Sequence, residues 1–331
     1  MVFFLFQIMP GDPVLLMMGQ RTDPAARKAV EQEYGFDQPL PVQYLYYLND
    51  LSPISFYQEA VLEEVQGWSP FTVFGVGLVL KSPDLRTSIQ TNQDVSKIIS
   101  DRFWGTFILA ITAMTFAVFV GIPIGVWISN QSGSWLDRFF LTTTVFGISA
   151  PSYVMGALAA YFLAFRWHDV TGLDPFGYLI DIDGATGEPV VIWHHLVLPA
   201  LTLGIRPLAV IVQLTRSSML DALSQDYVRT ARAKGLPERV VIFKHALRNA
   251  LNPVITAISG WVASLLAGAF FIEYIFAWKG LGSEMIHAIL TLDLPVIMGV
   301  TLFVGVVLVT VNIFVDLLYA WVDPRIRISG K

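Results

Sequence analysis

Long apolar blocks alternate with polar stretches along this chain. About 20 consecutive apolar residues cross the hydrocarbon core of a bilayer as an α-helix. Five segments reach that length: Trp104–Ile128, Phe139–Phe165, Leu196–Thr215, Val254–Phe276 and Leu294–Val322. Pro151 breaks the second segment, and Gly121–Gly125 in the first combines a proline kink with a small-xxx-small packing face. The pattern predicts an all-α integral membrane protein.

The N-terminal residues, MVFFLFQIMPGDPV, form a shorter apolar stretch. Its apolar part before Pro10 is roughly half the length of a spanning helix. It lacks the basic start and the small-residue cleavage site of a signal peptide. We therefore expect residues 1–18 to hold the end of a first span, truncated at its start, and the beginning of an outer segment. This makes six spans; a short interfacial segment is the alternative.

Residues 19–101 are polar and contain proline-rich turns such as DQPLP. We expect them to form an extracytoplasmic subdomain without catalytic residues, in which Val42–Leu51 and Phe71–Leu80 pack on the membrane face. Residues 102–322 would form the transmembrane domain with five spans, and residues 323–331 a cytoplasmic tail.

The most basic stretch of the chain, Gln225–Pro253, lies between two apolar segments. Spacings of three and four predict one apolar stripe on a short helix, made by Leu220, Leu223, Tyr227 and Ala231. Gly235 is placed as a helix terminator, and Pro237 suits the first turn of the next helix. A second stripe would comprise Leu236, Val240, Phe243, Leu247 and Leu251. Two amphipathic helices joined at a glycine indicate a docking surface for a partner.

Composition supports the membrane assignment. The 331 residues are 54% hydrophobic and 14% charged, with a mean hydropathy of +0.59, whereas about a quarter of an ordinary soluble chain is charged. A net charge of −5 gives no general basic face for nucleic acid. The absence of cysteine excludes disulfides, thiolate metal sites and cysteine nucleophiles.

The distribution of Lys and Arg predicts the orientation. The Ser129–Arg138 loop, the Arg216–Arg248 stretch and the tail after Asp323 carry one, seven and three basic residues. The two short loops between them, Arg166–His195 and Ala277–Asp293, carry one each. By the positive-inside rule the first three are cytoplasmic.

Several segments, in order along nearly the whole chain, resemble permease subunits of binding-protein-dependent ABC importers of the dipeptide, oligopeptide and nickel class. They are PGDP at 10–13, SWLDR at 134–138, RSSMLDALSQDYVRTARAKGL at 216–236, HALRNALNP at 245–253, GLG at 280–282 and VDLLYAWVDPRIR at 315–327. The chain departs from the family pattern in two segments. Arg229, Thr230 and Ala231 stand where the general importer motif has Glu-Ala-Ala, and Lys279 replaces a proline often found before GLG.

The resemblance implies a type I importer fold whose coupling loop, 216–253, docks into an ATP-hydrolysing subunit. The implied docking residues are Asp226, Tyr227, Arg229, Thr230, Ala231, Arg232, Lys234, Gly235 and Leu236. It further implies a second homologous permease subunit, two ATP-binding subunits that hold ATP and Mg²⁺, and an extracytoplasmic solute-binding protein. The chain would lie in a bacterial or archaeal cytoplasmic membrane with its C-terminus in the cytoplasm. Charge alone leaves open that Arg229, Arg232 and Lys234 only hold the loop near anionic lipid.

No motif in the sequence indicates an enzyme. The phosphate-binding G-x-x-x-x-G-K-[ST] loop, the HExxH helix and the GxSxG elbow are missing. An ion-coupled secondary transporter remains the alternative, but it calls for internal repeats, which are not evident, and for intramembrane carboxylates, which are scarce.

Two charged residues within apolar segments are candidates for the substrate pathway. Arg206 would face the path or form a structural ion pair, and Glu273 would meet a substrate amine or reach water. Asn312 and Asp316 suit helix packing. We expect His194 and His195 to be interfacial polar residues with no metal, and Asp181–Gly184 to form a hairpin turn.

Overall fold

The computed structural model describes residues 37–58, 68–73, 76–182 and 187–322, together with Phe3, Pro24, Arg27, Lys28 and Glu31. The end of the predicted first span and the tail at 323–331 therefore lie outside the described residues, except for Phe3. The chain divides into two compact units. One contains residues 1–101 and 287–303, and the other contains residues 102–286 and 304–331.

The first unit contains helix α4 (Leu40–Leu51) and a three-stranded antiparallel sheet of β1 (Ile54–Gln58), β2 (Trp68–Val73) and β3 (Val76–Leu80) in the order β1-β3-β2. Ile54 pairs with Leu80, which sets the register of the β1–β3 pair. This sheet is not predicted by the sequence analysis. The buried carboxylate of Asp293 accepts hydrogen bonds from the Ser88 hydroxyl (2.5 Å) and from two backbone N–H groups, so residues near 293 belong to this unit.

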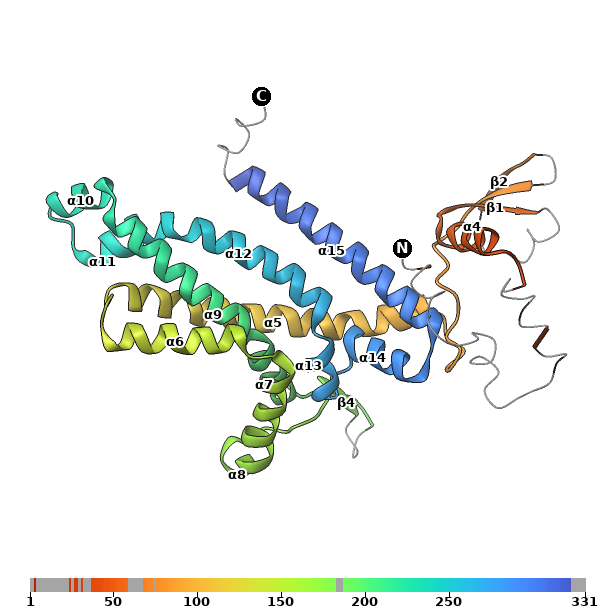
Figure 1. Ribbon diagram of the computed structural model, residues 1–331, viewed down its shortest axis with the longest axis horizontal. Coiled ribbons are helices and arrows are strands. Elements are labelled where there is room, and N and C mark those ends of the chain that lie inside the picture. The colour runs from red at the N-terminus through yellow and green to blue at the C-terminus, as the bar shows by residue number, and fades with distance from the viewer. Residues whose placement is uncertain are drawn as a thin grey trace. The chain divides into compact units, whose positions relative to one another are not determined.

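Helices make up nearly all of the rest of the described chain (Figure 1). The long ones are α5 (Val95–Ser129), α6 (Trp135–Ser149), α9 (His194–Ser224), α12 (Leu247–Gly268) and α15 (Leu294–Val322). The short ones are α7 (Ser152–Ala159), α8 (His168–Thr171), α10 (Asp226–Ala233), α11 (Glu238–Val240), α13 (Phe270–Ile275) and α14 (Leu281–Thr291). Two π-helical segments, η2 (Ala160–Arg166) and η3 (Val241–Ala246), interrupt the α-helical geometry.

The predicted membrane helices are confirmed as a class, and the described part of the chain holds four to five of them. Four helices there are long and apolar enough to cross a membrane, and a bent pair, Trp135–Ser149 with Ser152–Arg166, would make a fifth. The pair is bent by 105°. Pro151 is the N-cap of α7, where it cannot continue the preceding helix, so the sequence signal for a break at this proline is confirmed.

The predicted segment Val254–Phe276 is not one helix. α12 ends at Gly268, and Ala269, with ψ of 9°, separates it from α13. Apolarity is continuous through this break, so the hydrophobic pattern gives no sign of it. Strands β4 (Ile180–Ile182) and β5 (Pro189–Val191) form an antiparallel hairpin, so the chain reverses between Ile182 and Pro189. Asp183 and Gly184 of the predicted turn lie outside the described residues.

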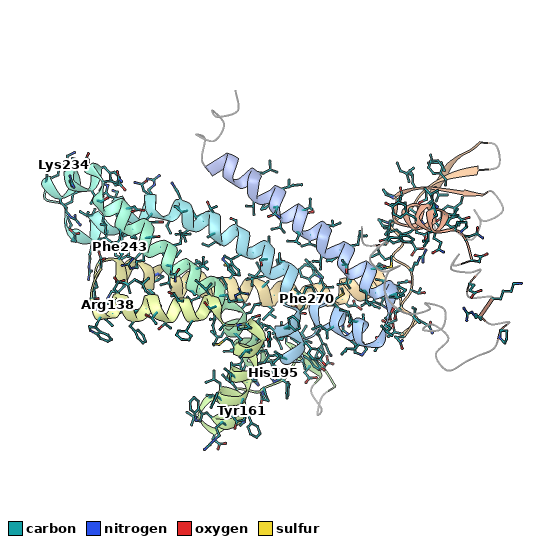
Figure 2. The ribbon with its side chains drawn as sticks, in the orientation of Figure 1. Arg138, Tyr161, His195, Lys234, Phe243 and Phe270 are labelled. Carbon is teal, nitrogen blue, oxygen red and sulfur yellow. The ribbon has the colours of Figure 1, made fainter. Side chains whose placement is uncertain are left out.

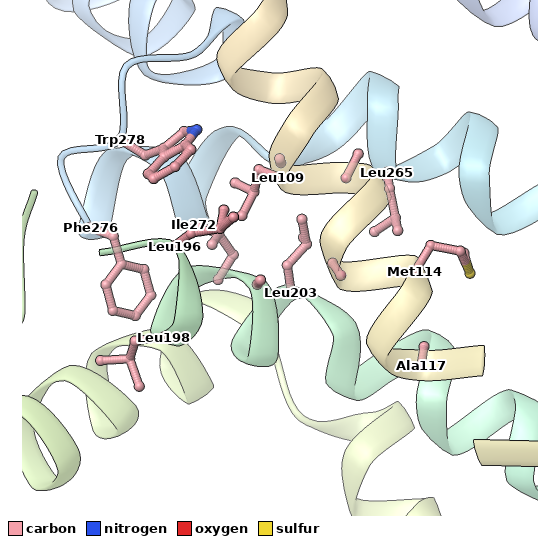
Figure 3. Close-up of a cluster of buried hydrophobic side chains, with 14 of the residues drawn as sticks. Leu109, Met114, Ala117, Leu196, Leu198, Leu203, Leu265, Ile272, Phe276 and Trp278 are labelled. Carbon is pink, nitrogen blue, oxygen red and sulfur yellow. The ribbon is translucent and has the colours of Figure 1, made fainter. Parts of the chain in front are cut away.

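The core of the second unit lies where α5, α9, α12 and α13 meet (Figure 3). Its side chains include Leu109, Met114, Leu203, Leu265, Ile272 and Trp278. Glycines allow α5 and α9 to approach closely. A Cβ on Gly121 would lie 2.9 Å from Ile211 Cγ2, and one on Gly125 would lie 2.5 Å from Thr215 Cβ. The predicted small-residue packing face of α5 is therefore confirmed.

Candidate functional site

Helix α10 lies at one end of the bundle formed by α5, α6, α9 and α12 (Figure 1). The chain breaks before it because Gln225, with φ −75° and ψ 152°, ends α9 and begins α10. α10, the turn at Gly235 and α11 form a helical hairpin, residues 226–240. A small apolar cluster, which we call the hairpin core, holds α10 in place. Its buried members are Val126, Met219, Ala222, Val228, Ala231, Val241, Ala246 and Ala250. α10 is thus packed against α9, η3 and α12 rather than suspended in a loop.

Gly235 ends α10 in a left-handed conformation, with φ of +73°. The Gly235 N–H donates to the Arg232 carbonyl (2.9 Å) and the Leu236 N–H donates to the Ala231 carbonyl (3.4 Å). This pair of bonds is the Schellman motif, which satisfies the last carbonyls of a helix and turns the chain sharply. The prediction that Gly235 terminates the helix is confirmed. Pro237 follows as the N-cap of α11, one position before the predicted first turn.

The predicted docking residues divide into an exposed and a buried group. Asp226, Tyr227, Arg229, Thr230, Arg232, Lys234, Gly235 and Leu236 are exposed, whereas Ala231 is 5% exposed and belongs to the hairpin core. Lys234 projects from the far tip of the hairpin (Figure 2). Most of these side chains are therefore accessible to a binding partner, whereas Ala231 packs α10 against the rest of the hairpin core.

One exposed cation is tied to the next helix. Arg232 Nη2 donates to Glu238 Oε1 at 2.6 Å, and Arg232 Nε donates to Glu238 Oε2 at 3.3 Å, across the turn at Gly235. This hydrogen bonding to Glu238 raises the pKa of Arg232 above its ordinary value. Arg229 makes only a 3.5 Å contact with Asp226, and its side chain is 74% exposed. Arg229 is therefore the more available cation.

Both predicted apolar stripes are wrong in detail. Leu220 and Leu223 lie on α9 while Tyr227 and Ala231 lie on α10, because the helix breaks at Gln225. In the second stripe Phe243 is 60% exposed, and the buried side is formed by Val241, Ala246, Ala250 and Val254. The π-helical turn η3 causes this shift, since a wider turn rotates every later residue relative to an α-helical repeat. The second helix also continues directly into the span.

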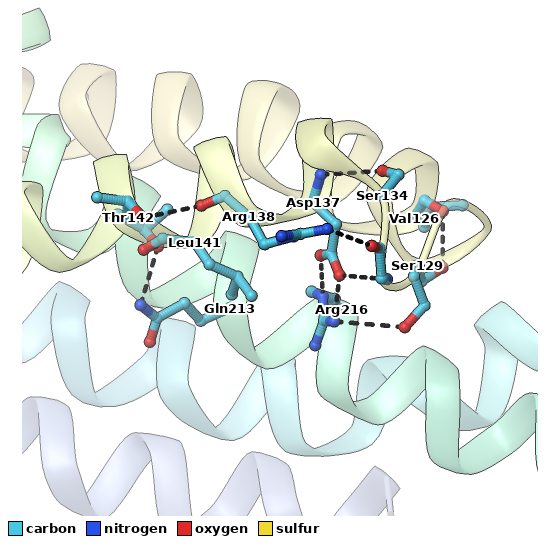
Figure 4. A network of polar contacts seen from close by, with 12 residues as sticks. Val126, Ser129, Ser134, Asp137, Arg138, Leu141, Thr142, Gln213 and Arg216 are labelled. Atoms are coloured by element: carbon cyan, nitrogen blue, oxygen red, sulfur yellow. Dashed lines mark hydrogen bonds and ion pairs between the residues drawn. The ribbon is translucent and has the colours of Figure 1, made fainter.

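An ion pair that the sequence analysis missed ties α6 to α9 (Figure 4). Arg216 donates to both carboxylate oxygens of Asp137, from Nε at 2.5 Å and from Nη2 at 2.6 Å. Asp137 Oδ2 also accepts from the Gly133 N–H (2.9 Å), and its side chain is only 3% exposed. Ser134 caps α6 by accepting from the Asp137 N–H. The SWLDR segment and the start of the RSSMLDA segment thus meet in one bidentate, largely buried pair.

The two pathway candidates lie in different environments. Arg206 is exposed on α9, and no described residue forms a hydrogen bond or ion pair with it. Glu273 is 0% exposed. Its Oε1 accepts from the Thr106 hydroxyl (2.6 Å), and its Oε2 accepts from the backbone N–H groups of Gly282 (2.7 Å) and Ser283 (3.0 Å).

Glu273 therefore caps the N-terminus of α14 through the GLG segment. Negative charge at a helix N-terminus satisfies free N–H groups and interacts favourably with the helix dipole. Gly280 and Gly282 leave room for this carboxylate, because a Cβ on either would overlap it or its neighbours. A second bond ties the segment after α13 to α5, because the indole N–H of Trp278 donates to the Gly105 carbonyl at 2.9 Å. A glutamate beside a Gly-Leu-Gly turn was a signal that could have suggested this role.

His194 and His195 form the first turn of α9 and not a loop, and Asp174 lies beside both. For Asn312 the structure shows an exposed position on α15. The side chain of Asp316 lies outside the described residues.

A bundle of apolar helices, of which four in the described part of the chain are long and apolar enough to cross a membrane, defines a multi-pass membrane protein. Known proteins agree. The family described as binding-protein-dependent transport system inner membrane component matches residues 121–328, and the corresponding N-terminal family matches residues 1–110. The chain belongs to this family, the permease subunits of binding-protein-dependent ABC importers.

Curated relatives match nearly the whole chain. The dipeptide transport system permease protein DppB of Escherichia coli K12 is 37% identical, over 99% of this chain and 93% of its own length. The glutathione transport system permease protein GsiC of Pectobacterium atrosepticum is 34% identical, over 99% of this chain and 92% of its own. A solved structure of the MetNI methionine ABC transporter, in an inward-facing conformation, matches 67% of this chain and 96% of its own with a TM-score of 0.50 and 14% identity. This last likeness concerns the fold alone.

Proposed function

We propose that this chain forms half of a peptide translocation pathway and couples it to ATP hydrolysis on partner subunits through α10. The observation that carries the proposal is the hairpin itself. Its exposed face carries Tyr227, Arg229, Thr230 and Lys234, while its other face is locked to α9 and α12 by the hairpin core. A partner bound to the exposed face would then move both long helices, because the hairpin core packs α10 in one cluster with residues of α9 and α12.

The coupling is proposed to spread from α10 in two directions. The short turn at Gly235 leads directly into α11 and the span that follows it. The Asp137–Arg216 pair extends the rigid body from α9 to α6. Movement of an ATPase subunit would in this way be transmitted to α6, α9 and α12. Alternating access requires such movement of whole helices as rigid elements.

The proposed assembly contains this chain, a second homologous permease subunit, two ATP-binding subunits and an extracytoplasmic solute-binding protein. ATP and Mg²⁺ would be held by the ATP-binding subunits. The seven basic residues of the stretch 216–248 support a cytoplasmic location for the hairpin, and with it a cytoplasmic C-terminus. Membrane lipid would surround the apolar faces.

The substrate class is proposed from the relatives, which are named for dipeptides, peptides and glutathione. These substrates share a free carboxylate. Arg206 suits such a ligand because it is exposed, on an apolar span, and free of any described partner. A guanidinium binds a carboxylate in bidentate fashion, which Lys cannot do. The saturated hydrogen bonding of Glu273 supports a structural role for that residue and not a contact with substrate.

The Arg206 proposal is tested by uptake kinetics of Arg206→Gln and Arg206→Lys. Loss of a charge-assisted contact to a carboxylate should raise the peptide KM by about tenfold or more, because such a bond contributes about 1.5–3 kcal/mol. Arg206→Lys should recover only part of this. An unchanged KM in Arg206→Gln would remove Arg206 from the pathway.

The ATP-driven mechanism is tested by reconstituting the chain with its partner subunits in proteoliposomes. Uptake of a labelled dipeptide should require ATP and the loaded binding protein, and it should persist when a protonophore collapses ion gradients. Uptake that continues without ATP and stops with the protonophore would support the ion-coupled secondary transporter instead.

A further inference from the structure

Three ligand-type side chains converge at the start of α9, outside every site described above. Asp174 follows α8, whereas His194 and His195 open α9 twenty residues later along the chain. His194 Nε2 lies 3.0 Å and His195 Nε2 lies 3.4 Å from the same oxygen, Asp174 Oδ2. We propose that Asp174, His194 and His195 form a binding site for a first-row transition-metal dication such as Zn²⁺. This goes beyond the proposed transport function.

The distances suit a shared metal ion. Metal bonds of about 2.0–2.1 Å at tetrahedral angles would place neighbouring ligand atoms about 3.3 Å apart. The two measured separations, 3.0 and 3.4 Å, bracket that value. Ligand atoms of all three residues lie within 4.8 Å of one another. Two imidazoles and one carboxylate, with a water molecule as fourth ligand, are a donor set that Zn²⁺ commonly takes in proteins.

The hydrogen bonding of His195 strengthens the assignment. Its Nδ1 lies 2.9 Å from the Tyr178 carbonyl, which can only accept, so Nδ1 carries the hydrogen. In the neutral ring Nε2 then has a lone pair, and that lone pair faces the Asp174 carboxylate, which is also an acceptor. A proton on Nε2 or a metal ion between the two acceptors makes this approach favourable, and the second histidine on the same carboxylate oxygen favours the metal ion. A backbone carbonyl on the far nitrogen is the arrangement by which metal-ligating histidines are oriented.

The surroundings fix His195 in this position. Its side chain is 12% exposed, against 51% for His194, so the cluster has a buried and an open side. A Cβ on Gly177 would overlap the His195 imidazole, so glycine is required where the loop crosses the ring. The His194 and His195 rings meet edge to face, with centroids 4.5 Å apart. The open side leaves a position for water or an exchangeable ligand.

The site would fasten the loop after α8 to the first turn of a membrane span. His195 lies in the first turn of α9, at the opposite end of this helix from α10 and Lys234 (Figure 2). The 30 residues from His195 to Ser224 extend about 45 Å as a helix, more than the thickness of the hydrocarbon core. The metal and the coupling hairpin therefore belong to opposite faces of the membrane. From the sequence alone no metal is expected, because two adjacent histidines at a loop end are more often interfacial polar residues, and Asp174 lies 20 positions away from His194.

The test uses the purified full-length chain carrying an affinity tag without histidine. Zn²⁺ binding is measured by competition with a chromophoric chelator, and Co²⁺ is then substituted to record its visible absorption. The expected result is one Zn²⁺ per chain and an intense Co²⁺ spectrum typical of four-coordinate nitrogen and oxygen ligation. The chain has no cysteine, so no thiolate contributes to either signal.

Three variants and two controls decide the assignment. Asp174→Asn and His195→Ala should each weaken Zn²⁺ binding by at least about tenfold, and Gly177→Ala should do so by disturbing the orientation of His195. His245→Ala and His287→Ala should bind as the native chain does. Thermal unfolding without metal shows whether each variant is folded. Binding that is absent in the native chain, or unchanged in Asp174→Asn and His195→Ala, would overturn the proposal and leave a protonated His195 as the cation between the two acceptors.

Discussion

At the residue scale, single positions with unusual backbone geometry or burial determine how the hairpin of α10 and α11 is built. Gly235 was predictable from the sequence, because a glycine at the end of a helical pattern before Pro-Glu is typical of a left-handed cap. The Asp137–Arg216 pair was not predictable, since its members are 79 positions apart and neither carries a local signal. The same holds for Asp174 with His194.

Replacement of Gly235 should reduce transport least in Gly235→Asn, more in Gly235→Ala and most in Gly235→Val. The residue has φ of +73°, and a Cβ there would meet nothing within 4 Å, so the cost is backbone strain alone. A residue other than glycine or asparagine costs about 1–2 kcal/mol in this conformation, and β-branching adds to it. ATP-driven uptake is the measurement, normalised to the amount of inserted chain.

Gly305 provides the control for this series, because a Cβ there also meets nothing within 4 Å but its backbone is helical. Gly305→Ala and Gly305→Val should transport normally. Equal activity of Gly235→Asn and Gly235→Val would contradict the coupling role given to the turn.

Breaking the Asp137–Arg216 pair from one side should be more harmful than removing both partners. Arg216→Ala leaves a carboxylate that is 3% exposed without its cation, and such changes cost about 3–5 kcal/mol. Thermal unfolding of Arg216→Ala, Asp137→Ala and the double variant gives the coupling free energy. Additive losses in the double variant would show that the pair does not act as a unit.

At the element scale, the sequence predicted which helices exist better than which side of each is buried. All five apolar segments correspond to helices, since length and apolarity are sufficient signals. The burial of the hairpin was misjudged because Gln225 breaks the first helix and η3 shifts the phase of the second. The α12–α13 break escaped detection because both sides of it are apolar.

The α13–α14 connection yields a prediction that separates structure from transport. Glu273→Ala would leave the Gly282 and Ser283 N–H groups without their acceptor, at about 1–3 kcal/mol for each buried group. Glu273→Ala should therefore lower the thermal unfolding midpoint, and Glu273→Gln should do so less. The peptide KM of Glu273→Gln should stay unchanged. A raised KM without loss of stability would instead place Glu273 in the substrate pathway.

At the scale of the whole molecule, the order of motifs along the chain was the sequence feature that best predicted the family. Segments from PGDP to VDLLYAWVDPRIR occur in sequence, and the family assignment to the permease subunits follows the same residues, 1–110 and 121–328. The small sheet β1–β3 could not be predicted with equal ease, because its strands lie in a mixed polar stretch without regular alternation. The long-range contacts that define each unit depend on packing, which one sequence does not display.

The central claim is that the exposed face of α10 docks on an ATP-hydrolysing subunit, and the absence of cysteine allows a direct test. Thr230→Cys places a single thiol on that face. Ala231→Cys places one in the hairpin core, and Val170→Cys places one in exposed α8, which lies well away from α10 (Figure 1). Each variant is co-expressed with ATPase subunits that carry a cysteine beside their docking cleft, and disulfide crosslinking is followed with and without ATP. We expect a crosslink from position 230 whose yield changes with ATP, and none from positions 231 or 170. No crosslink from position 230 in a well-inserted chain with stable partners would contradict it.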